Sequence, residues 1–189
     1  MKKTLEKIIN SSPLEFEGIP YDVVRRKVMY ARVEFKRNKL LVVVPPGFSP
    51  LRILEENKET IIKKFNRYMK HIEAAKKAPM VDWTIDQFES IVSTYIESYS
   101  RILKVKPRSI KFRKMKRRWG SCRSDGTITL NIFLQFVPQH LIAYIIFHEL
   151  AHLIVRNHGN KFKALIATQY PNYKELDKEI ALYGLKLLS

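Results

Sequence analysis

One short segment constrains this chain more than any other. Residues 141–147 form an unbroken apolar run, and the next two residues, His148 and Glu149, are ionisable. His152 follows after two more apolar residues. A segment that is apolar all round predicts a helix at the centre of a core, here expected over 138–156. Burying three ionisable groups on such a helix would be costly without a partner, so the segment indicates a built site.

The spacing of these groups favours a metal centre. On a helix, His148 and His152 lie one turn and about 40° apart, so both imidazoles can reach one tetrahedral Zn²⁺. Glu149 sits on the flank of that face, where it can reach a metal-bound water without ligating the metal. Zinc acidifies that water, and Glu149 can take its proton and later pass it to a leaving amine. We therefore expect one Zn²⁺ per chain with Glu149 as general base.

A third protein ligand is required, and His158 is the first choice. It follows His152 by six positions, so the helix must end between them, and Asn157 with Gly159 can provide that ending. A metzincin is disfavoured, because Val155 stands where that class has glycine and no methionine follows position 115. The remaining alternatives for the third ligand are Glu175, Glu179 and Cys122.

The rest of the chain has strong local signals. Alternation and β-branched runs predict strands at 30–35 and 40–44, with a turn at Arg37-Asn38, and basic or threonine-rich strands at 109–115 and 127–133. Helices are expected at 49–77, 82–103, 138–156, 160–170 and 171–188. Ala78-Pro79 breaks the pattern, which predicts an N-terminal module of hairpin plus helix at 1–78 and a second domain at 79–189.

The charge is strongly positive and uneven. Lys and Arg number 35 against 18 Asp and Glu, a formal net charge of +17, which attracts polyanions. Residues 101–125 carry eleven cations opposed only by Asp125. We expect non-specific nucleic-acid contact through this basic cluster. The residues predicted for that contact are Arg113, Lys116, Arg117 and Arg118.

Composition excludes several classes. The single cysteine, Cys122, excludes an intrachain disulfide framework and fits a reducing compartment. Residues 1–12 have the charge of a signal peptide without its apolar core, and no apolar run reaches the roughly 18 residues of a membrane span. We expect a cytoplasmic protein with no membrane association.

Three segments together carry a family resemblance. They are Arg118-Trp-Gly-Ser-Cys-Arg-Ser-Asp-Gly-Thr-Ile-Thr-Leu-Asn131, then Ile146-Phe-His-Glu-Leu-Ala-His-Leu153, then Asn157-His158. In this combination the chain resembles the YgjP-like zinc metallopeptidases, relatives of the SprT-like zincins, over about residues 20–170.

The resemblance implies an α+β fold. A zincin-like catalytic domain, with the HExxH helix packed on a small antiparallel sheet, would follow a small β-rich N-terminal module and helices. It also implies His148, His152 and His158 as zinc ligands, Glu149 as base and a polypeptide as substrate. Phe162 matches an aromatic position of the family.

The Trp119-Gly-Ser-Cys122 motif has two interpretations. It is either a tight turn whose Trp packs in the core, or part of a cleft rim formed with the 127–133 strand. In the second case an extended substrate would pair with a sheet edge as another strand. The candidate substrate-binding residues are Trp119, Gly120, Ser121 and Asn131. The candidates for stabilising an oxyanion are Tyr170, Tyr173, Arg118 and Arg156.

The alternative function is a nucleic-acid-associated basic protein whose zinc site is structural or vestigial. Glu149 separates the two hypotheses. A structural site has no need of a general base and normally fills its fourth position with Cys or His. The intact HExxH pattern therefore favours the enzyme.

Overall fold

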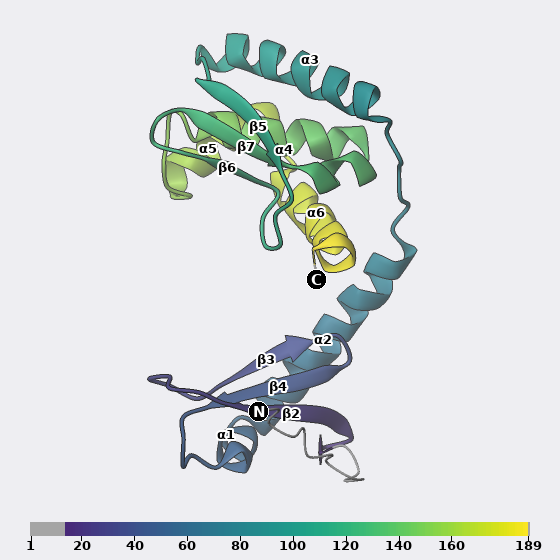
Figure 1. Cartoon of the computed structure of the whole chain (residues 1–189), viewed down its shortest axis with the longest axis vertical. Coiled ribbons are helices and arrows are strands. Elements are labelled where there is room, and N and C mark those ends of the chain that lie inside the picture. Colours follow the sequence, from purple (N-terminus) through teal and green to yellow (C-terminus); the bar gives the residue numbers. More distant parts are fainter. Residues whose placement is uncertain (1–13, 189) are drawn as a thin grey trace, which may run out of the picture. The chain divides into compact units, whose positions relative to one another are not determined.

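The structure is a computed structural model that describes residues 14–188. The chain divides into two compact units, Met1–Glu73 and Ala74–Ser189, and each is described by itself (Figure 1). Residues 1–12, the segment weighed above as a leader, lie outside the described residues. Within residues 14–188, no helix combines the length and apolarity needed to cross a membrane.

The N-terminal unit is a four-stranded sheet with helices. Its strands are β1 (Glu15–Phe16), β2 (Ile19–Arg25), β3 (Arg32–Lys36) and β4 (Lys39–Val44), in the order β1-β2-β4-β3. The hairpin expected around Arg37-Asn38 is confirmed, because β3 and β4 pair antiparallel on either side of it. By contrast, β2 runs parallel to β4. The strand β4 therefore lies between β2 and β3. Apolar residues follow one another in β4 because both faces of this strand are covered.

The helix expected over 49–77 is broken in two. The helix α1 (Pro50–Glu56) begins after Ser49, with Pro50 in its first turn, and α2 (Lys58–Lys77) begins two residues after α1 ends. Asn57 lies between them with φ −123°, and its Nδ2 donates to the Ile53 carbonyl at 2.9 Å. A short amide side chain that hydrogen-bonds the nearby backbone competes with helix continuation, which explains the break.

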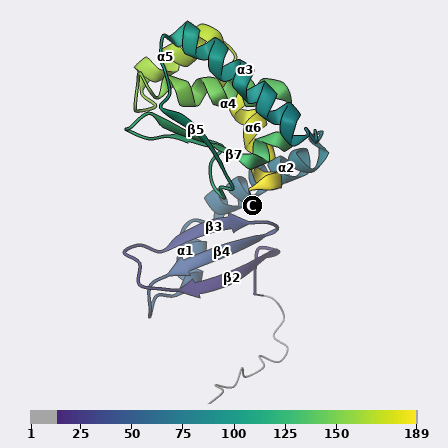
Figure 2. The ribbon, with the colours of Figure 1, turned by 45° about the horizontal axis from the view of Figure 1, so that its top comes forward.

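The second unit is built around one buried helix. Its elements are α3 (Ile85–Leu103), β5 (Ser109–Arg113), β6 (Gly120–Cys122), β7 (Thr127–Asn131), the 3₁₀ helix η1 (Ile132–Phe136), α4 (Gln139–Ala151), α5 (Asn160–Gln169) and α6 (Tyr173–Leu187). The helix α4 contacts α3, α5, α6, β6 and β7. Figure 2 shows α3 lying along α4. The apolar run therefore forms the centre of the core, as its sequence predicts.

The strands of the small sheet in this unit do not all run in the directions that we expected. Its order is β5-β7-β6, with β5 parallel and β6 antiparallel to β7. The α+β class is confirmed, but the sheet is mixed rather than antiparallel. Residues 120–122 form the edge strand β6 rather than a tight turn. The strand expected over 127–133 is the central one and ends at Asn131, whose side chain accepts from Phe133 N–H and starts η1.

Several helix boundaries also shift. The second helix begins after Thr84, not Asp82, because Thr84 and Gln87 form a reciprocal capping box. The central helix ends at Ala151 instead of Arg156, since the next amides, Leu153 and Ile154, turn back to carbonyls three residues earlier. The last two helices begin after Gly159 and Asn172.

Candidate active site

Three histidines converge beyond the end of α4. His148 Nε2 lies 3.0 Å from His158 Nε2, and His152 Nε2 lies 3.1 Å from the same atom. His148 and His152 come from the last turn of α4 and its C-cap, whereas His158 comes from the loop before α5. The early end of α4 is what lets the chain fold back and bring His158 to the other two. Together these nitrogens could hold a metal ion.

Neighbouring groups hold the imidazoles in a metal-binding state. His152 Nδ1 lies 3.0 Å from the Val155 carbonyl, which can only accept, so Nδ1 carries the proton and Nε2 presents its lone pair. Burial, together with the neighbouring His152 and His158, lowers the pKa of His148 to about 3. Burial also lowers the pKa of His152. The neutral form, which is the form that binds metals, is therefore favoured.

Phe162 of α5 forms an apolar backing for the cluster. Its ring centroid lies 4.9, 4.5 and 4.8 Å from the ring centroids of His148, His152 and His158. Phe162 is buried. One aromatic side chain thus touches all three imidazoles and restricts their orientations.

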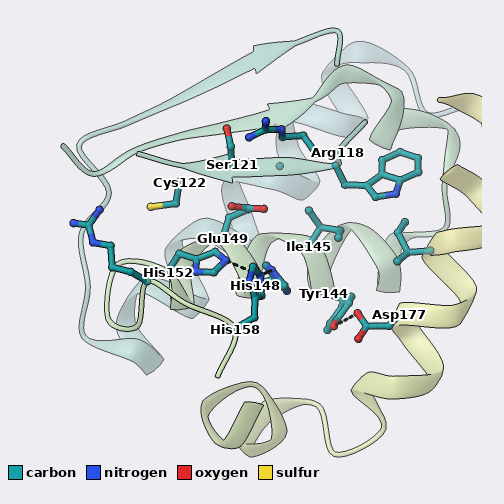
Figure 3. A pocket seen from close by; sticks show the side chains of 14 residues that line it. Arg118, Ser121, Cys122, Tyr144, Ile145, His148, Glu149, His152, His158 and Asp177 are labelled. Carbon is teal, nitrogen blue, oxygen red and sulfur yellow. Dashed lines mark hydrogen bonds between the residues drawn. The ribbon is translucent and has the colours of Figure 1, made fainter. Parts of the chain in front are cut away.

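Glu149 is buried beside this cluster, under the strand β6 (Figure 3). Its Oε2 atom has no hydrogen-bond partner in the protein, an unusual state for a buried carboxylate. Burial raises the pKa of Glu149 to about 7, and Arg118 opposes that rise. A carboxyl group with an unpartnered oxygen and a pKa near neutrality suits proton transfer.

A cavity of about 500 Å³ opens over these groups. Six residues singled out from the sequence line it besides the histidines and Glu149: Arg118, Trp119, Gly120, Ser121, Cys122 and Arg156. In Figure 3, Ser121 and Cys122 lie on the strand above Glu149, across the cavity from the histidines. The structure therefore brings the WGSC motif and the HExxH motif to one place.

Asn131 lies elsewhere. It is fully buried and does not line the cavity. Its Nδ2 donates to the carbonyls of Met115 and Arg118, both at 2.8 Å, and its Oδ1 accepts from the amides of Met115 and Phe133. Asn131 thus holds the loop that leads into β6, and its position suits that anchoring rather than direct substrate contact.

The alternative third ligands and the oxyanion candidates lie in different parts of the second unit. Of the described residues, Cys122, Glu175 and Glu179 are not part of the metal-ligating group, and Glu179 contacts His140 instead. Tyr170 faces the core, where its hydroxyl meets that of Tyr99 at 2.6 Å. Tyr173 lines a smaller cavity next to His148 and His158. Among the oxyanion candidates, Arg118 and Arg156 are the two that line the main cavity.

Sequence reasoning missed Tyr144 and Asp177. The Tyr144 hydroxyl donates to Asp177 Oδ1 at 2.6 Å, and both residues line the cavity. Burial and Asp177 raise the pKa of Tyr144. Tyr144 lies four residues before His148, so the helical period alone could have placed it on the same face. Asp177 comes from α6 and gave no comparable signal.

The basic cluster lies on β5 and the loops around β6. Arg113, Lys116, Arg117 and Arg118 are all exposed. Of the described residues from 104 to 123, none takes part in a salt bridge. This surface therefore keeps a large excess of positive charge that no salt bridge offsets.

Comparison with known proteins settles the family. The profile of the YgjP-like metallopeptidase domain matches residues 71–182, more than half of the chain. The chain belongs to this family. Its match includes α4, the three histidines and the WGSC motif, so the resemblance expected from those motifs is confirmed. The YgjP-like domain is a metallopeptidase domain, which agrees with a metal-binding site and a polypeptide substrate. No curated protein matches the chain.

Two solved structures are similar to part of the chain. One is the metallopeptidase zymogen of Pyrococcus abyssi abylysin, 26% identical over 47% of this chain and 90% of that chain, with a TM-score of 0.44. The other is the metallopeptidase zymogen of Methanocaldococcus jannaschii jannalysin. It is 24% identical over 48% of this chain and 93% of that chain, also with a TM-score of 0.44.

Proposed function

We propose that this YgjP-like protein is a zinc-dependent peptidase that hydrolyses peptide bonds, with Glu149 as general base. The observation that best supports this proposal is that three histidine nitrogens converge beside a buried carboxylate. The Oε2 atom of that carboxylate has no partner in the protein. Nitrogens bound to one tetrahedral Zn²⁺ lie about 3.3 Å apart at Zn–N distances of about 2.0–2.1 Å. The separations of 3.0 and 3.1 Å fit that donor set.

The number of ligands also supports a catalytic centre. Among residues 14–188 the ligating group has three members, which leaves a fourth position of a tetrahedral ion for water or substrate. Zinc held by His148, His152 and His158 would supply Lewis-acid polarisation and would acidify a water molecule in that position. Glu149 Oε2 is the group placed to take a proton from water and to return it to the leaving amine. Arg118 and Arg156 line the same cavity and supply positive charge for a developing oxyanion.

The free edge of β6 supports an extended substrate. Asn131 N–H donates to the Trp119 carbonyl, and Arg123 N–H donates to the Thr127 carbonyl. Hydrogen-bonded pairs alternate in an antiparallel ladder, so Gly120 and Cys122 direct their backbone groups away from β7. Within residues 14–188, β6 pairs with no other strand. A polypeptide can pair with this edge beside the histidines, with Trp119 and Ser121 at its flanks.

The decisive experiment compares zinc-loaded wild type with Glu149→Gln on fluorescently labelled unfolded casein. The amide keeps the shape but cannot accept the proton, so kcat should fall by about 10²–10⁴-fold with zinc content unchanged. Glu175→Gln is a matched control, because Glu175 is exposed on α6 and does not line the cavity. If Glu149→Gln cleaves casein as fast as wild type, Glu149 is not the base and the proposal is wrong.

We also propose that the basic cluster of residues 101–125 binds nucleic acid weakly and without sequence preference. Its cations are exposed, and none of those from 104 to 123 forms a salt bridge within residues 14–188. Contacts between such cations and phosphates carry no base information. This contact would recruit the peptidase to a polyanion, and its failure would leave the peptidase proposal intact.

A further inference from the structure

Gly120 lies directly against the carboxylate side chain of Glu149. A Cβ atom at position 120 would be 2.5 Å from both Cγ and Oε1 of Glu149 and 2.6 Å from its Cδ. Contacts this short do not occur between real side chains, so no residue other than glycine fits while Glu149 keeps its place. Backbone freedom is not the reason for this glycine, because its φ is not positive, unlike that of Gly126.

Neither backbone can move aside to relieve such a contact. The strand β6 is paired with β7, whose residues Ile128, Leu130 and Asn131 are fully buried. On the other side, α4 is the core helix, and Leu150, next to Glu149, is also fully buried. The tightly packed interior resists displacement of either element. The Glu149 side chain is therefore the one part that can yield.

We propose that Gly120 is a positioning residue that holds the Glu149 carboxylate beside the three histidines by leaving a slot of glycine size in β6. The inference rests on the proposed peptidase function, in which Glu149 moves the proton. Gly120 acts through Glu149 and need not touch the reacting atoms itself. The sequence motif WGSC thus requires its glycine because of a residue 29 positions away.

The first test is Gly120→Ala, measured with labelled unfolded casein on zinc-loaded protein. Displacing a catalytic group by about 1 Å lowers rates on the order of 10²-fold, so kcat should fall by about that factor while KM and zinc content stay near wild type. Gly184→Ala is the matched control, because a Cβ there would meet only Trp119 Nε1 at 3.8 Å, an ordinary contact. Equal kcat values for the two alanine variants would overturn the proposal.

The second test does not depend on activity. Thermal unfolding of the metal-free protein gives a double-mutant cycle between positions 120 and 149. Gly120→Ala should lower the melting temperature in wild type. It should leave the temperature unchanged or raise it in Glu149→Ala, where the clashing atoms are gone and alanine restricts the unfolded chain. Equal shifts in both backgrounds would refute the steric slot. Full activity of Glu149→Gln, in contrast, would refute the peptidase mechanism and leave this cycle unaffected.

Discussion

The cores of the two units differ in the kinds of side chain that they bury. The N-terminal core consists of apolar and aromatic side chains from β1, β2, β4, α1 and α2. Of the described residues, three polar or charged ones are buried, Thr127, Asn131 and Glu149, and all belong to the second unit. A buried carboxylate without a partner lowers stability. The second unit thus buries a destabilising carboxyl group where the core of the first unit is apolar, and that group lies at the candidate site.

The largest effect that separates the two units should come from the proposed metal ligands. His152→Ala should reduce zinc from one ion per chain to none detectable by elemental analysis. It should also remove the stabilisation that zinc gives the folded state, about 2.7 kcal/mol at a hundredfold excess over Kd. His140→Ala is the control, because His140 is exposed on the same helix and contacts Glu179. Zinc uptake by the His152 variant equal to wild type would contradict the ligand assignment.

A matched pair of phenylalanine variants, one in each core, tests the difference between the two units. Phe65→Ala in the N-terminal core and Phe162→Ala in the second core should each lower the free energy of unfolding by about 3–5 kcal/mol. Only Phe162→Ala should weaken zinc binding, because Phe162 packs against all three imidazoles. Denaturant unfolding and calorimetric zinc titration measure both quantities. Equal zinc affinities in the two variants would show that the aromatic backing does not orient the ligands.

The buried carboxylate predicts a pH dependence of stability in metal-free protein. Burial raises the pKa of Glu149 from 4.5 to about 7, so the folded state keeps this proton longer than the unfolded state. The contribution of Glu149 to stability should therefore fall as pH rises from 4.5 to 7 and level off above, whereas the lowered pKa values of His148 and His152 add stability as pH rises to about 6.5 in wild type and in Glu149→Gln alike. Glu149→Gln should lack this component and exceed wild type by on the order of 1–3 kcal/mol at pH 8. Chemical unfolding at several pH values, with exposed Glu59→Gln as control, tests this.

The smallest expected effect concerns charge. Changing Arg113, Lys116 and Arg117 to Gln should flatten the salt dependence of nucleic-acid binding by roughly 0.7–0.9 for each phosphate that the variant no longer neutralises. The control changes three exposed cations of α2 in the other unit, Lys63, Lys64 and Lys70. Fluorescence anisotropy with a labelled oligonucleotide at several salt concentrations measures the slope. Equal flattening by both variants would mean that the cluster is only part of the overall charge.

Local patterns predicted much of the fold. The apolar run of α4, the hairpin of β3 and β4 and the three convergent histidines all follow from spacing and residue type. The end of α4 could not be predicted, because Leu153, Ile154 and Val155 are compatible with helix. The position of this end depends on the chain folding back after the helix, so that the Val155 carbonyl lies 3.0 Å from His152 Nδ1. Strand direction was equally hidden, since alternation is the same in parallel and antiparallel strands.

Prediction of the candidate site from the sequence was limited in the same way. His148, Glu149 and His152 lie within one turn of helix, so the sequence alone placed them together. Gly120 was expected to contact substrate, but its contact with Glu149 depends on packing between β6 and α4. Asp177 reaches Tyr144 only because α6 packs on α4. Contacts between distant elements are what the sequence pattern does not encode.

The early end of α4 has an electrostatic consequence. The peptide dipoles of a helix add up to a partial negative charge at its carboxyl end. Because α4 stops at Ala151, this end lies beside His148 and His152. A cation held by those side chains would gain about 0.3–1 kcal/mol from the helix dipole, an attraction that falls off within the last turn. A helix that continued to Arg156 would have carried its negative end past His148 and His152.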